Sequence, residues 1–118
     1  MESIPYINKK ALIRNELLKC AKAKTLRVLT YGEFGKRVEI PARGPWKPIL
    51  DLIAHEEIDE GLPDITFLIV AKRTGYPGQI GFKPASPPSA AQKDHAIKEI
   101  QKVIDLYNPG SANPYAGA

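Results

Sequence analysis

The side chains best suited to catalysis are few and widely separated in this chain. Its 118 residues include one cysteine, Cys20, and two histidines, His55 and His95. A metal site or an activated thiol needs further ligands or a base at a regular spacing, and no such spacing is present. Residues 56–60 (EEIDE) could supply paired carboxylates for acid–base chemistry, but an acidic run that ends a helix is more typical of a solvated face. We therefore expect no enzyme activity, no metal and no cofactor.

The basic side chains suggest a different chemistry, the binding of a polyanion. The net charge is +4, and the cations gather in residues 9–27, 37–47 and 72–73, away from the acidic run. Such separation is typical of a positive face, although an ordinary solvated surface shows the same pattern. The residues that we expect to contact nucleic acid are Tyr31, Arg37, Arg43, Lys47, Lys72 and Arg73.

A helix-turn-helix pattern would position most of these residues. Thr30 and Glu33 form a capping box, which predicts a helix from Tyr31 to about Val38. After a turn containing Pro41 and Arg43, a second helix is expected to begin near Gly44 or Pro45, because proline is tolerated in a first turn. Its apolar residues recur at helical spacing, and glycine and proline end it. These residues are Trp46, Ile49, Leu50 and Ile53, followed by Gly61 and Pro63.

The remaining segments are expected to surround this pair of helices. A first helix is predicted from about Asn8 to Lys24, with an apolar stripe that includes a buried Cys20 thiol. A short strand should follow at 26–29. Residues 65–70 are apolar on both faces, which predicts a central strand, and 79–82 should return antiparallel to it after a glycine turn. Ser89 should cap a last helix.

These elements predict an α+β fold: a winged helix-turn-helix with a short antiparallel β-hairpin wing and flanking N- and C-terminal helices. We expect one domain over 1–107 and a flexible tail over 108–118. No apolar run approaches the length of a membrane span, and the first residues lack a signal-peptide pattern. A cytoplasmic protein that makes no contact with membranes is the resulting expectation.

The order of short motifs over roughly residues 28–82 resembles a known family. Residues 30–34 (TYGEF) correspond to a Thr-Tyr-Gly-Glu-Leu segment, and 41–44 (PARG) stand near an Ala-Arg-Ala-Val-Gly segment. Residues 70–75 look like the segment that follows the active site in that family, and Gly81 and Phe82 look like the family's closing Gly-Gly-Tyr. The chain in this respect is similar to the C-terminal DNA-binding domain of the O6-alkylguanine-DNA alkyltransferases and their alkyltransferase-like relatives.

The resemblance also shows what this chain lacks. The reactive cysteine of that family lies in a Pro-Cys-His-Arg-Val segment, whereas residues 66–70 read TFLIV, without cysteine, histidine, tryptophan or alanine. Alkyl transfer needs an activated thiolate, so we exclude that activity. What the resemblance implies for binding is minor-groove recognition, with Tyr31 helping to rotate a nucleotide and Arg43 inserting in its place. Residues 44–46 (GPW) depart from the small apolar residues of the family at the insertion point.

Three functions remain open from the sequence. The first is a small non-enzymatic protein that binds duplex DNA, plain or damaged. The second is a protein-interaction module, such as an adaptor or a virus-encoded inhibitor of a host nucleic-acid enzyme, that would use the acidic helix end and the last helix. The third is a damage sensor that flips a base without repairing it, which would need a pocket beside Phe67. The oligomeric state is left open.

Overall fold

Two short parallel strands lie among four α-helices in the part of the chain described by this computed structural model, residues 4–80 and 87–116. In chain order the elements are α1 (Lys10–Ala21), β1 (Leu29–Thr30), α2 (Tyr31–Val38), α3 (Trp46–Asp59), β2 (Ile69–Val70) and α4 (Ala90–Tyr107). The described part of the chain also contains three 3-10 helices, η1 (Ile7–Lys9), η2 (Ile65–Leu68) and η3 (Gly78–Ile80). The fold is mixed α+β, as the sequence predicts.

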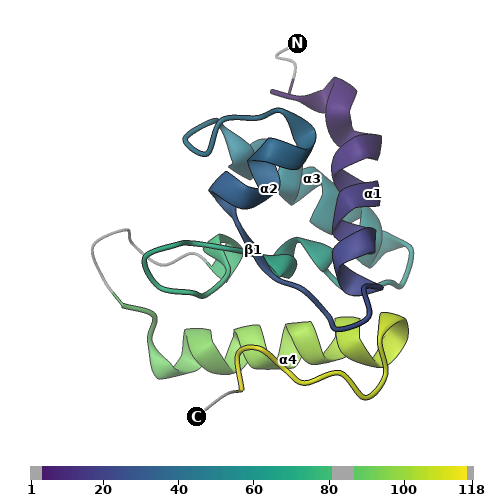
Figure 1. Cartoon of the computed structure of the whole chain (residues 1–118), viewed down its shortest axis with the longest axis vertical. Coiled ribbons are helices and arrows are strands. Elements are labelled where there is room, and N and C mark those ends of the chain that lie inside the picture. Colours follow the sequence, from purple (N-terminus) through teal and green to yellow (C-terminus); the bar gives the residue numbers. More distant parts are fainter. Residues whose placement is uncertain (1–3, 81–86, 117–118) are drawn as a thin grey trace.

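The helices are arranged in two groups. In Figure 1, α1, α2 and α3 lie together at one end of the molecule, and α4 crosses the other end with the C-terminal segment running back along it. The short strands and η2 lie between the two groups, and η2 contacts α1, α3 and α4. The hydrophobic core therefore surrounds a short 3-10 helix that lies near the middle of the molecule.

The predicted long strand at 65–70 is wrong for its first four residues. These residues form η2 and are all buried, and only Ile69 and Val70 are extended. A strand covered on both faces and a buried helical turn give the same uninterrupted apolar run, so the apolar pattern does not distinguish them. The side chain of Asp64 caps the turn by accepting a hydrogen bond from the backbone N–H of Thr66.

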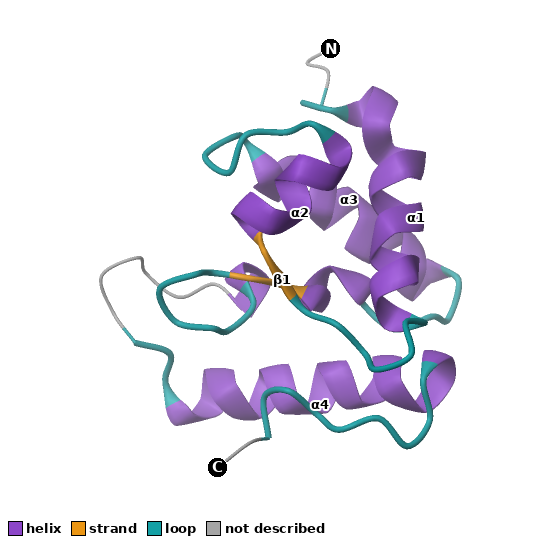
Figure 2. Ribbon diagram, viewed as in Figure 1, coloured by secondary structure: helices purple, strands orange, loops and turns teal. Residues whose placement is uncertain are grey.

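The sheet differs from the predicted hairpin. Leu29 pairs with Ile69 and Thr30 with Val70, and the two strands are parallel. Figure 2 shows the strands in orange, between the upper helices and α4. The turn after β2 makes one antiparallel bridge, between Val70 and Pro77. In the expected return strand, the first two residues lie in η3, and Gly81 and Phe82 lie outside the described residues. An antiparallel wing is therefore not confirmed.

The predicted capping box at Thr30 and the predicted cap at Ser89 are both present, and the cap at Ser89 is itself a capping box. The Thr30 hydroxyl accepts from the Glu33 N–H and the Glu33 carboxylate accepts from the Thr30 N–H, and Ser89 and Gln92 repeat this arrangement at the start of α4. The predicted stripe of the first helix is buried, including the free thiol of Cys20. That helix is shorter than predicted, because Ile7–Lys9 are 3-10 and Lys22 is already the C-cap. The next strand begins at Leu29, later than predicted.

No helix among the described residues is both long and apolar enough to span a membrane.

The C-terminal segment is packed, so the prediction of a flexible tail over 108–118 is wrong for its described part. The Asn108 amide donates to the carbonyls of Ala21 and Ala23, and the Ser111 hydroxyl accepts from the Leu26 N–H. Tyr115 is only 4% exposed, and its hydroxyl donates to the carbonyl of Phe67 in η2. Residues 108–115 therefore belong to the fold.

Replacing Tyr115 by phenylalanine should lower the free energy of unfolding by about 1–2 kcal/mol, because a buried carbonyl loses its donor. The matched control is Tyr107→Phe. Tyr107 is half-buried, and no hydrogen bond of its hydroxyl is found within the described residues. Urea unfolding followed by circular dichroism measures both variants. Equal stability of the two variants would contradict the packed tail.

Burial also acts on the carboxyl group that caps η2. Removal from water raises the pKa of Asp64 above its ordinary value of 3.8, and the hydrogen bonds from the Thr66 hydroxyl and N–H oppose this rise. The folded chain therefore holds a proton on Asp64 at pH values at which the unfolded chain has released it.

Asp64→Asn should remove a pH-dependent loss of stability. A raised native pKa gives a contribution that is complete below the unfolded pKa and is lost as the pH rises through the native pKa. The free energy of unfolding of the wild type should therefore fall relative to that of Asp64→Asn as the pH rises from below the ordinary pKa of 3.8 through the raised native pKa. Asparagine keeps a side-chain oxygen that can cap η2. A difference between the two proteins that stays constant with pH in urea unfolding would refute the raised pKa.

Candidate nucleic-acid interface

The turn between α2 and α3, residues 39–45, is held tightly at its first residues. Glu39 is the C-cap of α2 in a left-handed conformation with φ +58°, and the Ile40 N–H donates to the carbonyl of Gly35 at 3.0 Å. The ammonium of Lys9 donates to the carbonyls of Val38 at 2.7 Å and Glu39 at 3.0 Å. A cation at the C-terminal end of a helix satisfies carbonyls that have no partner within the helix.

The second half of the turn is fixed by a tryptophan. The indole N–H of Trp46 and the backbone N–H of Gly44 both donate to the carbonyl of Pro41, at 3.0 and 2.9 Å. Gly44 also fits closely under Tyr6, since a Cβ at position 44 would lie 3.0 Å from the Tyr6 hydroxyl oxygen. Between these fixed residues, the side chain of Arg43 is exposed to solvent. The backbone of the turn is therefore ordered before any ligand binds.

Tyr31 is half-buried at the start of α2. Its ring lies 5.7 Å from the ring of Trp46, and a Cβ on Gly78 would lie 2.2 Å from its hydroxyl oxygen. Burial, with a smaller contribution from Asp51, raises the pKa of Tyr31 to about 12. The phenol is therefore neutral near pH 7 and can donate a hydrogen bond. The Tyr31 ring therefore packs between Trp46 of α3 and Gly78 of η3.

Two shallow hollows meet at Tyr31 and Ala42. The first has a volume of about 480 Å³, and the second has a volume of about 510 Å³. The first is lined by Tyr31, Ala42, Gly44, Pro45, Trp46, Lys47, Pro48, Gly78 and Gln79. The second is lined by Thr30, Tyr31, Gly32, Glu33, Lys36, Ala42 and Lys72. We call the residues of both hollows, together with Arg43, the turn surface.

Three of the six predicted contact residues line the two hollows: Tyr31, Lys47 and Lys72. The exposed Arg43 lies between the lining residues Ala42 and Gly44 in the turn. Lys47 forms an exposed ion pair with Asp51 at 3.1 Å, which stabilises little because water screens it. Neither Arg43 nor Lys72 forms an ion pair with any residue that the structure describes. Of these predicted residues, Arg43 and Lys72 are therefore unpaired cations and Lys47 is weakly paired.

Arg37 lies elsewhere. Its guanidinium lies 3.7 Å from a carboxylate oxygen of Glu16 and 3.7 Å from the sulfur of Cys20, both on α1. Burial raises the pKa of the Cys20 thiol, and the nearby Arg37 charge opposes this rise, so the thiol stays protonated near neutral pH. Arg73 is exposed in the turn after β2 and borders neither hollow of the turn surface.

Lys36 is a member of the turn surface that the sequence reasoning missed. It lies one helical turn after Gly32, and both line the second hollow. The signal was available in the sequence: Phe34 and Val38 point inward, so position 36 lies on the outer side of α2. Like Arg43, Lys36 has no ion-pair partner in the described part of the chain.

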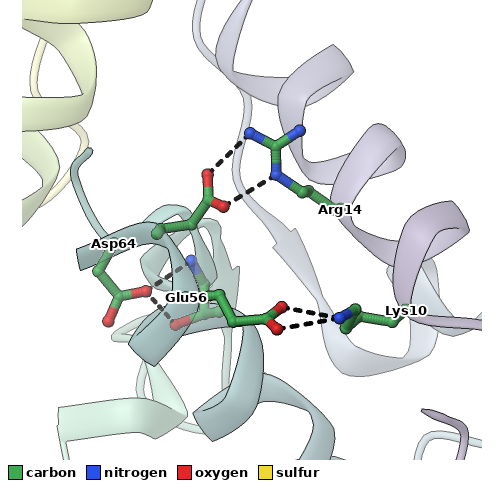
Figure 3. Close-up of polar contacts among 6 residues, drawn as sticks. Lys10, Arg14, Glu56 and Asp64 are labelled. Atoms are coloured by element: carbon green, nitrogen blue, oxygen red, sulfur yellow. Dashed lines mark hydrogen bonds and ion pairs between the residues drawn. The ribbon is translucent and has the colours of Figure 1, made fainter. Parts of the chain in front are cut away.

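The acidic end of α3 is used mainly for ion pairs with α1. Arg14 donates through two nitrogens to both carboxylate oxygens of Glu57, which is 4% exposed, and Lys10 pairs with Glu56 at 2.9 Å (Figure 3). This bidentate pairing is the main reason why the pKa of Arg14 is raised. Within 4–80 and 87–116, no three His, Cys, Asp or Glu side chains gather as metal ligands do.

The chain matches no family model, no curated protein and no solved structure.

Gly35→Ala should lower the free energy of unfolding by about 2–3 kcal/mol, because the new Cβ would lie 2.2 Å from the carbonyl oxygen of Ile40 at the start of the turn. Gly32→Ala is the matched control in the same helix. A Cβ at position 32 would meet only ordinary contacts at 3.9 Å, and alanine there should add up to about 1 kcal/mol of stability. Thermal and urea unfolding measure both variants. Similar losses in the two would contradict the close approach.

Proposed function

We propose that the protein is a small, non-enzymatic DNA-binding protein that contacts duplex phosphates with the turn surface. The observation that carries this proposal is the grouping of Lys36, Arg43, Lys47 and Lys72 around a rigid turn. A preordered turn loses little conformational freedom on binding, and cations on one surface release counterions from the same stretch of duplex. Arg73, next to Lys72 in the turn after β2, remains a predicted phosphate contact.

The family resemblance supports the same partner and a limited version of its chemistry. In this proposal α2 and α3 act as a helix-turn-helix, and the turn after β2 takes the place of the wing. The segment that corresponds to the reactive centre, residues 66–70, is buried and contains no thiol. Tyr31 is packed against Trp46 and Gly78, so we assign it to the wall of the surface and Arg43 to the contact with DNA.

The affinity for a fluorescein-labelled duplex, measured by anisotropy at about 50 mM and about 200 mM salt, should fall steeply with salt. Arg43→Ala should weaken binding and reduce the slope of log affinity against log salt by about 1, because one phosphate contact is lost. Lys36→Ala and Lys72→Ala should act in the same direction for the same reason.

Two variants control for the loss of a positive charge. Lys22→Ala removes a cation from the end of α1, where it lies 5.5 Å from the ring of Tyr107. Arg37→Ala removes the cation that pairs with Glu16. Both should keep the wild-type affinity and slope. If Arg43→Ala binds as the wild type does, or if salt has no effect, the DNA-binding proposal fails.

A protein-interaction module is the second candidate, favoured by a different surface. Ile58 and Leu106 are 59% and 51% exposed although both are large and apolar. Ile58 borders a hollow of about 490 Å³ that Glu99 and Lys102 also line, between the end of α3 and α4. An adaptor or a virus-encoded inhibitor of a host nucleic-acid enzyme would use this end of the molecule. Recovery of one stable partner after nuclease treatment, lost in Ile58→Asp, would favour this function.

The damage-sensor function receives less support from the geometry. Phe67 is 3% exposed and its ring packs edge-on against His95, while Tyr115 bonds to its carbonyl. The position beside Phe67 is therefore occupied by the protein itself. A duplex that carries an alkylated guanine tests this function in the same anisotropy assay, and equal affinity for plain and alkylated duplexes would eliminate it.

A further inference from the structure

The C-terminal segment buries a single side chain in the fold. Of residues 108–116, only Tyr115 is buried, whereas Ala112, Pro114 and Ala116 are exposed. No helix or strand includes these residues, and the segment runs back along α4 (Figure 1). The segment therefore contacts the rest of the molecule as a bound peptide does, through one inserted aromatic ring and a few hydrogen bonds.

The site that receives Tyr115 matches a phenol on two sides. The ring of Tyr115 stacks on the ring of Tyr76, with centroids 5.7 Å apart and planes at 26°. Its hydroxyl donates to the carbonyl of Phe67, and burial raises the pKa of Tyr115, so the hydroxyl stays a donor. The ammonium of Lys93 lies 5.8 Å from the centre of the Tyr76 ring. A flat ring with a hydrogen-bond donor at its far end is required.

Asn113, two positions before Tyr115, makes a second set of contacts with α4. The amide of Asn113 donates to the carbonyl of Ile97 at 3.0 Å and to the side-chain oxygen of Gln101 at 3.1 Å, both on α4. The oxygen of the same amide accepts from the Tyr115 N–H at 3.0 Å. Asn113 thus folds the Asn-Pro-Tyr segment into a turn and ties that turn to α4. The groove therefore contacts two side chains of the segment, those of Asn113 and Tyr115.

The segment is connected to α4 by a short hinge. Asn108, Pro109 and Gly110 join them, and Gly110 has a φ of +89°, which glycine adopts without strain. Because residues 111–116 share no helix or strand with the body of the protein, they can leave without breaking regular secondary structure. The same segment from another molecule could then make every contact described above.

We propose that the groove formed by Tyr76, the Phe67 carbonyl, Ile97 and Gln101 is a binding site for an Asn-Pro-Tyr turn, filled here by the chain's own tail and able to take the tail of a second copy. A tethered tail has an effective concentration in the millimolar range, so the intramolecular contact dominates in dilute solution. Exchange between copies becomes significant only when the protein concentration approaches that range.

The test uses the full chain with the groove emptied by Asn113→Ala and Tyr115→Ala together. A labelled peptide of residues 111–116 should bind this variant roughly tenfold more tightly than the same peptide with its tyrosine replaced by alanine. The wild type, whose groove is filled, should bind neither peptide measurably. If the emptied chain is folded and binds the two peptides equally, the proposal is wrong.

Two further measurements cover an emptied chain that unfolds. In that case the tyrosine peptide must restore its helical circular dichroism, because a ligand that binds only the folded state shifts the folding equilibrium. Failure to restore it would mean that Tyr115 is an ordinary core residue. Light scattering of the wild type at about millimolar concentration should detect dimers that the emptied variant does not form. A wild type that stays monomeric there overturns the exchange between copies.

Discussion

The carbonyl of Pro41 is the acceptor on which the candidate interface depends. It receives one hydrogen bond from the indole of Trp46 and one from the backbone of Gly44, so a buried side chain and the tip of the turn share one oxygen. Trp46 is 5% exposed and also contacts the rings of Phe34 and Tyr31. The hydrophobic core thus sets the position of an exposed turn, and the backbone that carries the exposed Arg43 side chain is fixed by buried groups.

Two groups of cations among the described residues have different roles. Arg14, Lys10 and Arg37 pair with acidic side chains across the interfaces of α1 and stabilise the packing of helices. Lys36 and Arg43 pair with no acidic group in the described chain and lie around the turn. A net charge of +4 says little about this division, because it counts paired and unpaired cations alike. The position of each partner decides which cations are free to meet a polyanion.

Local signals in the sequence predicted the helices well. The capping box at Thr30, the cap at Ser89 and the stripe of α1 depend on residues within one or two turns, and all three are confirmed. Contacts between distant residues were missed, such as the parallel pairing of Leu29 with Ile69 and the insertion of Tyr115 beside η2. Arg37 was predicted as a contact because the sequence does not reveal that Glu16 lies opposite its side chain. Which face of a helix is paired depends on the tertiary fold.

Chemical-shift mapping by NMR during titration with a short duplex tests the central claim most directly. The account predicts that the backbone amides of the turn surface shift, with the largest changes at Arg43 and Gly44, while the amides of α4 remain unchanged. The indole N–H of Trp46 should keep its hydrogen-bonded shift throughout, because the turn does not refold on binding. Shifts confined to the end of α3 and to α4, or no shifts at all, would contradict the account.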